Sequence, residues 1–416
     1  METSATIEDV NTATEASPPA DSAAPPLTAP PRVASIDAYR GLVMLLMASE
    51  GLGITKVAKS FVDSGFWQFL SYQVDHVQWI GCSLWDLIQP SFTFLVGVAL
   101  PYSIASRAAK GDSFRTMLRH AVVRSLALVF LGILLRSDGK IQTNFTFEDT
   151  LTQIGLGYTF CFLLAFRPVR VQFGAALGLL AAYWLAFLLY PLPASGFDYA
   201  SVGVPADWQH LQGMAAHWDK NTNLASGFGR WFMNLFPREE PFAFNSGGYE
   251  TLSFIPTLGT MIFGLMAGGL LKSSVEAREK IRVLVLAGIA GLVVGQLLGL
   301  TGICPIVKRI WTPSWTIFSA GWCCLIMAAF YWLMDVRQKT RWAFPLIVVG
   351  MNSIAMYVIA HIFPEMIGRT LKTHLGQNVF ERVGGIYAPI LEASALLLVM
   401  WLIVYWMYRR KLFLKI

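Results

Sequence analysis

The chain has 416 residues, of which 55% are hydrophobic and only 14% are charged, and its mean hydropathy is +0.52. Because soluble domains carry about 25% charged residues, this composition excludes an ordinary soluble domain and indicates an integral membrane protein. The net charge of +6 is therefore not read as a sign of nucleic-acid binding. The five cysteines show no spacing that predicts a metal site or a disulfide framework.

The N-terminal residues 1–31 differ in composition from the rest of the chain. They are rich in Pro, Ala, Ser and Thr and contain no long apolar run. This composition predicts a disordered cytoplasmic tail, because such a segment buries too little apolar surface to fold. We expect residues 32–416 to form one transmembrane domain.

From Ser35 onward, apolar segments of about 20 residues recur, which is the length that crosses the hydrocarbon core of a bilayer. They predict an all-α, polytopic membrane protein with about ten transmembrane helices. The predicted spans are residues 36–55, 82–105, 117–135, 151–166, 171–190, 253–271, 281–300, 314–334, 344–363 and 386–408.

Basic residues gather in every second connection between these spans and after the last one. Short basic loops remain on the cytoplasmic side of a membrane, so we expect both termini to be cytoplasmic. The connections 56–81 and 191–252 then face outward. The chain also lacks a basic segment followed by a signal-peptide core. A bacterial cytoplasmic (inner) membrane is therefore the expected location.

The outer segment 191–252 is rich in aromatic residues, among them Trp208, Trp218 and Trp231. Such residues can form a platform for a sugar, or they can lie at the level of the lipid headgroups. Both interpretations stay open at this point.

Glycines recur at four-residue spacing in two consecutive spans. Gly264 and Gly268 lie in the sixth span, and Gly291, Gly295 and Gly299 lie in the seventh. Small residues at this spacing let helix backbones approach closely in lipid, so the pattern predicts tight packing and carries no functional content.

A titratable group of residues lies where the outer connection 56–81 enters the second span. His76 follows Asp75, and Asp86 lies about one turn inside the apolar segment. A carboxylate in a span costs roughly 2.5–3.5 kcal/mol on insertion scales, so it needs a partner or a function. His76 is suited to proton transfer or nucleophilic catalysis, with Asp86 as its electrostatic partner. The competing interpretation is a histidine that only bonds backbone at a helix start.

The ninth span carries a second polar set. Asn352 and Ser353 fall in its middle, and His361 falls near the outer surface at a depth similar to that of His76. These side chains either line a transfer path or hydrogen-bond between helices.

Two further pairs of charged residues have both a functional and a structural interpretation. Asp37 and Arg40 are three apart at the cytoplasmic start of the first span, where they pair on one helix face or receive a phosphate. On the outer side, Lys308 and Arg309 precede Trp311. They either contact an anionic substrate or anchor the segment at the interface.

These residues fall in five segments that resemble, in order, the heparan-alpha-glucosaminide N-acetyltransferase family and its bacterial relatives. Residues 32–42 resemble its pattern R-x-x-S-L-D-x-x-R-G-L, and residues 76–97 resemble H-x-x-W-x-G-x-x-x-x-D-L-x-x-P-x-F-x-F-x-x-G. Residues 151–154, 308–314 and 350–361 are similar to L-Q-R-I, N-K-x-L-W-T-P-S and G-x-N-S-I-x-x-Y-x-x-H.

The resemblance implies an acetyl-CoA-dependent acetyltransferase that moves an acetyl group from cytoplasmic acetyl-CoA to an amino sugar or glycan on the extracytoplasmic side. It places the catalytic histidine at His76, either as an acetyl carrier or as a base. The expected catalytic residues are His76, Asp86, Asn352 and His361, the expected cofactor contacts are Arg40 and Asp37, and the expected substrate contacts are Trp79, Lys308, Arg309 and Trp311.

Two other functions remain open from the sequence. A transporter or permease would use Asp86, Asn352 and His361 as a polar pathway, and a membrane scaffold would bind no ligand at these residues. The expected partners are the lipid bilayer, a sugar or glycan acceptor and a second copy of the chain in a homodimer. No metal and no nucleic acid are expected.

Overall fold

The structure, a computed structural model, describes residues 33–414, and the predicted tail at residues 1–31 lies outside the described residues. Within residues 33–414 the regular structure is helical, and the single β-type contact is an isolated antiparallel bridge between Ile80 and Val307. The all-α prediction is therefore confirmed for the described part of the chain.

The helices follow the apolar segments of the sequence. They are α1 (Ala34–Ala48), α2 (Ile54–Ala58), α3 (Gly65–Gln73), α4 (Ile88–Ala108), α5 (Phe114–Arg136), α6 (Thr150–Leu164), α7 (Val169–Leu189), α8 (Leu224–Met233), α9 (Phe254–Lys272), α10 (Ala277–Leu300), α11 (Pro313–Phe330), α12 (Phe344–Met351), α13 (Ser353–Ile362), α14 (Pro364–Leu375), α15 (Val379–Gly384) and α16 (Ala388–Arg409).

Within the described residues, seven helical segments are long and apolar enough to cross a membrane. They contain α4, α5, α7, α9, α10, α11 and α16. The number rises to nine if each of two bent helix pairs is one span, and α6 is a further apolar helix of 15 residues. These helices account for every predicted span and confirm a polytopic membrane protein, while the number of crossings and the side of the termini stay predictions.

Two predicted spans are not the continuous helices that the sequence suggested. The segment 36–55 bends by 46° after α1, where Glu50, Gly51, Leu52 and Gly53 all have positive φ, between 45° and 68°. A non-glycine residue in this conformation costs roughly 1–2 kcal/mol, so the turn is held by its packing. The segment 344–363 bends by 71° between α12 and α13, at Asn352.

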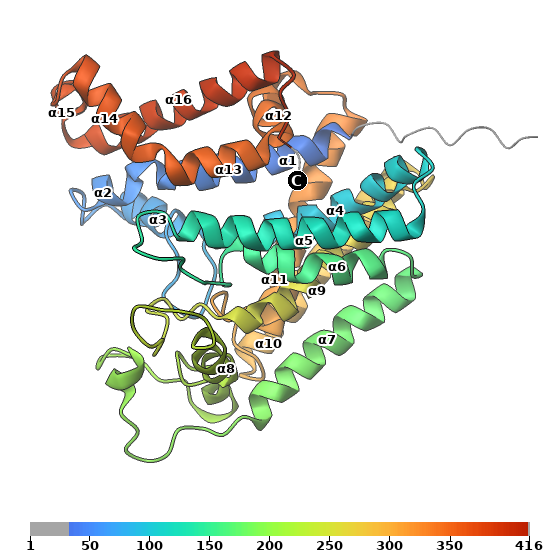
Figure 1. The fold of residues 1–416 in the computed structure, drawn as a ribbon, viewed down its shortest axis with the longest axis vertical. Helices are drawn as coiled ribbons and strands as arrows, with labels where there is room; N and C mark the ends of the chain where they lie inside the picture. Colours follow the sequence, from blue (N-terminus) through green and yellow to red (C-terminus); the bar gives the residue numbers. More distant parts are fainter. Residues whose placement is uncertain (1–32, 415–416) are drawn as a thin grey trace, which may run out of the picture.

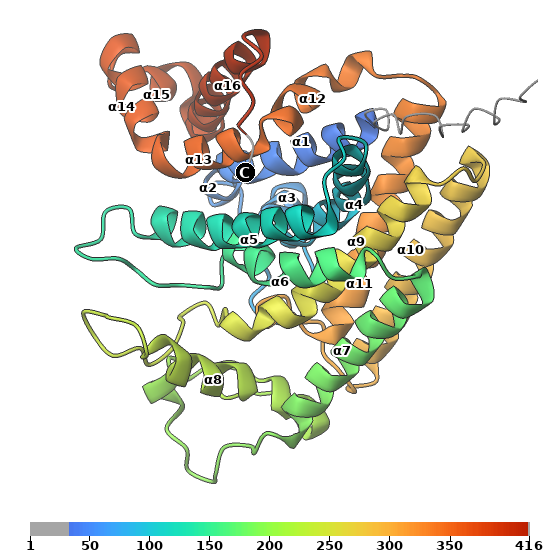
Figure 2. The same ribbon diagram turned by 45° about the vertical axis from the view of Figure 1, so that its right-hand side comes forward.

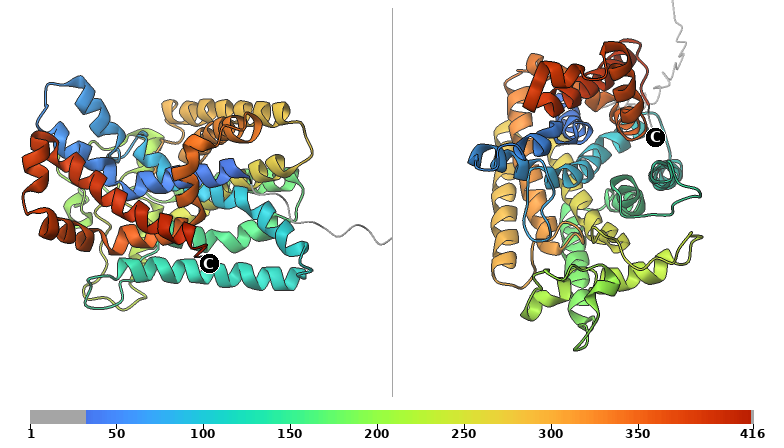
Figure 3. Two further views of the ribbon diagram at one scale, coloured as in Figure 1. Left: turned by 90° about the horizontal axis from the view of Figure 1, so that it is seen from above. Right: turned by 90° about the vertical axis from the view of Figure 1, so that its left-hand side faces the viewer.

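Glycines allow the closest helix contacts, as predicted. Gly264 and Gly268 of α9 lie against the backbone of α4, and a Cβ atom at Gly97 of α4 would overlap the backbone of α9. On the other side of the protein, Gly291 and Gly295 of α10 pack on α11 in the same way. In Figure 3, α5 and α10 lie on opposite sides of the helical body, with α1 and α4 between them.

The outward-facing sides of several helices are apolar, which suits contact with lipid rather than water. On α5 and α10 the exposed large hydrophobic residues include Val123, Leu126, Phe130, Leu134, Leu286, Ile289, Val293 and Leu297. The basic connections after α4, α6 and α9 gather toward one side of the molecule, and α2, α14 and α15 lie toward the other (Figure 1). We call these the basic side and the opposite side.

The segment 191–252 folds into a small layer on the opposite side, at the far end of α7 (Figure 2). Trp218 is completely buried and stacks on Phe187 of α7, with ring centroids 6.2 Å apart. Trp231 is 61% exposed, so the three tryptophans do not share one role. The layer has its own apolar core, which also contains Trp79 and Val307.

Glu250 lies buried at the end of this layer and gives a test of its stability. Burial raises the pKa of this carboxyl from 4.5 to about 8, Glu148 adds to the increase, and Ser226 and Arg230 oppose it. The folded state therefore binds more protons than the unfolded chain between pH 4.5 and 8, and the stability contributed by Glu250 falls as pH rises through this window.

We expect Glu250→Gln to stabilise the protein at pH 8 relative to wild type, by on the order of 3 kcal/mol, with little difference near pH 4.5. Thermal unfolding of the purified protein in detergent at both pH values measures this difference. Equal shifts at both pH values would contradict the assignment of a protonated Glu250 in the folded state.

Candidate functional site

The structure brings His76, Asp86 and Lys308 together, although Lys308 lies 232 positions after His76. The Nδ1 atom of His76 is 2.7 Å from Oδ1 of Asp86. The Nζ atom of Lys308 is 3.0 Å from the same Nδ1 and 3.3 Å from Oδ1 of Asp86. We call these three residues the His76 cluster.

Asp86 is almost completely buried, and its carboxylate is held by several donors. Its Oδ2 accepts hydrogen bonds from the backbone N and the Oγ of Ser83, at 3.1 and 3.0 Å, and from the backbone N of Val77 at 3.3 Å. The sequence suggested that Asp86 lies one turn inside the helix, but it lies in a short 3-10 turn before α4. These bonds stabilise the ionised carboxylate where it faces His76.

The loop that carries Lys308 is tied to the loop that carries His76. The backbone N of Gly81 donates to the carbonyl of Ile306 at 3.0 Å, next to the bridge between Ile80 and Val307. Arg309 adds a third contact between the two loops, because its Nη2 donates to the carbonyl of Val77 at 3.2 Å. Backbone contacts thus place Lys308 on His76.

Lys308 is buried, at 4% exposure. Burial lowers the pKa of its ammonium group from 10.5 to about 8, and the negative charge of Asp86 limits that decrease. Lys308 therefore titrates close to the physiological range, which is unusual for lysine and common at functional sites.

The His76 ring has one nitrogen available. We assign the Nδ1 proton to the short contact with Asp86, because a carboxylate can only accept. The ammonium of Lys308 can only donate, so it pairs with Asp86 and lies beside Nδ1 without a hydrogen bond to it. The other ring nitrogen, Nε2, then carries a lone pair, and within residues 33–414 it makes no protein hydrogen bond. The side chain is 35% exposed, so an external molecule can reach it. The arrangement provides a nucleophile or a base with a fixed tautomer.

The other predicted substrate contacts are mainly structural in this fold. Trp79 is 5% exposed and donates from Nε1 to the carbonyl of Trp218 at 3.1 Å. Trp311 is buried and donates to Oγ1 of Thr260. Arg309 donates from Nη1 to the carbonyl of Gly247 at 2.6 Å. These contacts give the three residues structural roles and do not test a substrate-binding role.

His361 and Asn352 make their hydrogen bonds away from the His76 cluster. The Nδ1 atom of His361 donates to the carbonyl of Tyr357 within its own helix, at 2.8 Å, and the two rings stack. The amide of Asn352 holds the segment after α16, with bonds to Leu412 and Leu414 of 3.0 and 3.2 Å. Their catalytic roles therefore stay predictions, while these contacts give each a structural role.

Asp37 and Arg40 lie on α1, as predicted, with Oδ1 and Nη1 3.4 Å apart. Arg40 also lines a cavity of about 430 Å³ between α1, α4, α5, α6 and the break between α12 and α13. Arg107 and Arg124 line it as well, and no acidic side chain of the described residues contributes to its wall.

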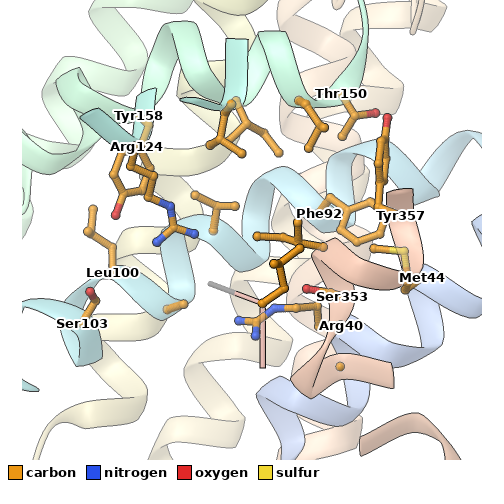
Figure 4. Close-up of a pocket in the computed structure, with 18 of the residues that line it drawn as sticks. Arg40, Met44, Phe92, Leu100, Ser103, Arg124, Thr150, Tyr158, Ser353 and Tyr357 are labelled. Atoms are coloured by element: carbon orange, nitrogen blue, oxygen red, sulfur yellow. The ribbon is translucent and has the colours of Figure 1, made fainter. Parts of the chain in front are cut away.

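Figure 4 shows Arg40 and Arg124 pointing into this cavity, with Ser103 toward one end and Thr150 and Tyr357 toward the other. The guanidinium of Arg124 lies 4.9 Å from the ring centre of Tyr158, and its buried Nε atom has no hydrogen-bond partner in the described residues. A buried donor without a partner costs about 1–3 kcal/mol, which indicates that a ligand or water satisfies it.

Helix α4 connects the cavity with the His76 cluster. Asp86 lies just before its first turn, and Phe92, Val96, Leu100 and Arg107 of the same helix line the cavity. At a rise of 1.5 Å per residue, Phe92 begins the lining roughly 9 Å along the helix from Asp86.

Sequence reasoning missed several residues of these two sites. Ser83 precedes Asp86 by three positions, and this S-x-x-D spacing is a signal for a local cap that could have been used. Arg124 and Tyr158 lie in ordinary apolar segments, and nothing in the sequence marks them as cavity residues. Tyr249, whose ring centre is 5.0 Å from the guanidinium of Arg309, had no signal either.

The fold and the His76 cluster define a polytopic helical membrane protein with a His–Asp–Lys group on the side opposite its basic connections, in which Asp86 and Lys308 are buried and the imidazole is partly exposed. No protein-family model matches the chain. It is 24% identical over 436 residues to heparan-alpha-glucosaminide N-acetyltransferase of Homo sapiens and 23% identical over 432 residues to that of Mus musculus.

These alignments cover 93% and 92% of this chain, and the chain spans about 60% of the length of each relative. They confirm the predicted relationship to the heparan-alpha-glucosaminide N-acetyltransferases at the level of the family.

Proposed function

We propose that this protein is a membrane acetyltransferase that uses acetyl-CoA bound from the basic side to acetylate an amino sugar or glycan on the opposite side. The observation that carries this proposal is the His76 cluster, in which Asp86 fixes an exposed imidazole with a free Nε2 atom and Lys308 neutralises Asp86. The names of the two relatives supply the reaction class.

In this function His76 reacts directly. An amine that attacks a thioester must lose a proton, and the lone pair on Nε2 either accepts that proton or attacks the thioester carbon itself. In the second case the C–S bond breaks, CoA leaves as the thiolate, and the ring becomes an acetylated imidazolium. The acceptor amine later takes the acetyl group from the ring and releases a proton to solvent, which restores the neutral imidazole. Asp86 holds Nδ1 in both cases and stabilises the cation that forms.

The cavity with three arginines suits the donor. CoA carries phosphate groups, which guanidinium groups bind well, and a long apolar-polar arm that a cavity walled by Phe92, Leu100 and Leu128 can hold. Arg107 lies in the last turn of α4 on the basic side, which the positive-inside rule places in the cytoplasm, and Arg40 lies near the middle of α1. A bacterial cytoplasmic membrane remains the proposed location.

The structure gives no specific support for the transporter alternative. Among the described residues, Asp86, Asn352 and His361 share no hydrogen-bond partner and are bonded to three different parts of the chain. A continuous polar pathway would need them to face one another.

Acetyl-CoA binding to the detergent-purified protein tests the proposal directly. We expect Arg124→Gln to weaken the Kd by about 10- to 150-fold, because a charge-assisted contact of about 1.5–3 kcal/mol is lost. The matched control is Arg282→Gln, since Arg282 is 68% exposed on α10 and does not line the cavity. Calorimetry gives both constants.

A wild-type protein that binds no acetyl-CoA, or that transports a sugar without it, would overturn the proposed function. If both arginine substitutions weaken acetyl-CoA binding equally, the cavity is not the donor site.

A further inference from the structure

The outer layer contains a second His–Asp pair that the proposed reaction does not use. The Nδ1 atom of His210 is 2.6 Å from Oδ2 of Asp219. The other carboxylate oxygen accepts hydrogen bonds from Nε1 of Trp208 and from the backbone N of Lys220, both at 2.9 Å. Asp219 is 4% exposed and fully bonded, so it orients its neighbours and is not itself a ligand.

The imidazole of His210 is oriented toward an external molecule in the same way as that of His76. Its Nδ1 is held by the carboxylate, its side chain is 32% exposed, and within residues 33–414 its Nε2 makes no hydrogen bond. With the proton on Nδ1, Nε2 accepts a hydrogen bond from a hydroxyl group. Tyr199 covers one face of the ring, with centroids 4.1 Å apart.

Lys220 adds a donor beside this ring. Its Nζ atom lies 5.0 Å from the ring centre of Trp208, and in the described part of the chain it has no acidic partner. Burial lowers the pKa of Lys220, and the positive charge of Arg309 lowers it further.

A chain of contacts joins this second pair to the His76 cluster. The ring of Trp208 meets the edge of Trp79 at a centroid distance of 5.8 Å, and Trp79 is three residues after His76. Trp79 also donates from Nε1 to the carbonyl of Trp218, the residue before Asp219, at 3.1 Å. The loops that carry the two histidines are therefore in contact, through aromatic residues of both.

We propose that His210, Lys220 and Tyr199 form a second saccharide subsite, which holds the sugar unit next to the one acetylated at His76. The acceptor is then a glycan of at least two units, and this inference rests on the proposed function. A sugar hydroxyl donates to Nε2 of His210, the ammonium of Lys220 donates to a sugar oxygen, and Tyr199 contacts the apolar face of the ring.

The test compares glucosamine with a β-1,4-linked glucosamine trisaccharide as acceptors for the full-length protein in detergent. We expect His210→Ala to lower the preference for the trisaccharide, measured as the ratio of the two kcat/KM values, by about tenfold, mainly through KM of the trisaccharide. Lys220→Gln should act in the same direction. His217→Ala is the matched control, because His217 lies in the same layer and bonds the carbonyl of Tyr190.

An unchanged acceptor ratio in His210→Ala would overturn the subsite. Equal losses with both acceptors together with a lower Tm would also overturn it, because the His210–Asp219 pair would then only stabilise the loop. Calorimetry of trisaccharide binding separates this failure from failure of the proposed reaction. If wild type acetylates neither acceptor, trisaccharide binding that His210→Ala weakens still supports the subsite, and binding that it leaves unchanged overturns it.

Discussion

Replacing His76 by alanine should lower acetyl-CoA-dependent acetylation of an amino sugar by at least about 10³-fold, because the Nε2 atom that serves as base or nucleophile in the proposed reaction is removed. Binding of acetyl-CoA should persist, since the cavity with Arg40 and Arg124 does not include His76. Single-turnover rates and the acetyl-CoA Kd, measured on the same preparation, separate these two effects.

His361→Ala is the informative comparison for this prediction. The imidazole of His361 bonds the carbonyl of Tyr357 within its own helix, so we expect a small effect on rate. A loss equal to that of His76→Ala would place His361 in the reaction after all. Full activity in His76→Ala would contradict the catalytic assignment of His76.

The same proteins show what His76 does. Incubation with radiolabelled acetyl-CoA, in the absence of acceptor, should label wild type and leave His76→Ala unlabelled if the ring carries the acetyl group. Absence of label in both proteins, with activity lost in the variant, assigns His76 as the base.

The sequence was sufficient to predict the membrane spans, because bilayer thickness demands long apolar runs and those runs are visible in the chain. It did not show the breaks at residues 50–53 and at Asn352. Each break carries a few polar or glycine residues, but apolar residues on both sides make one segment long enough to cross a bilayer, so the pattern favoured one continuous helix. The break after α1 depends on how Gly51 and Gly53 pack against Val74 and Pro389, contacts that no local pattern reports.

The contacts of His76 were predictable from the sequence only where its partner is close in the chain. Asp86 lies ten residues after His76, and a histidine and a buried carboxylate so close in the chain are natural partners. From the sequence, Lys308 was either a contact to an anionic substrate or an interface anchor, since its position beside His76 depends on the pairing of two loops through Ile80 and Val307. Lys308, which was predicted to contact substrate, is therefore part of the His76 cluster.

The buried lysine gives the second large prediction. Lys308 has a pKa of about 8, against an ordinary value of 10.5, so its ammonium loses its proton as pH rises through about 8. The cation neutralises Asp86, which holds His76. We expect kcat/KM of wild type to fall above pH 8 and to approach a tenfold decrease for each pH unit.

Two substitutions show whether Lys308 causes this decrease. Lys308→Met has nothing to titrate and leaves Asp86 without its cation, so it should remove the alkaline decrease and lower kcat/KM at pH 7 by about 10²-fold. Lys308→Arg keeps its charge to beyond pH 12, so the decrease should move to higher pH even if the larger group slows the reaction. A decrease near pH 8 that survives in both variants belongs to another group, and Lys308 would then have only a structural role.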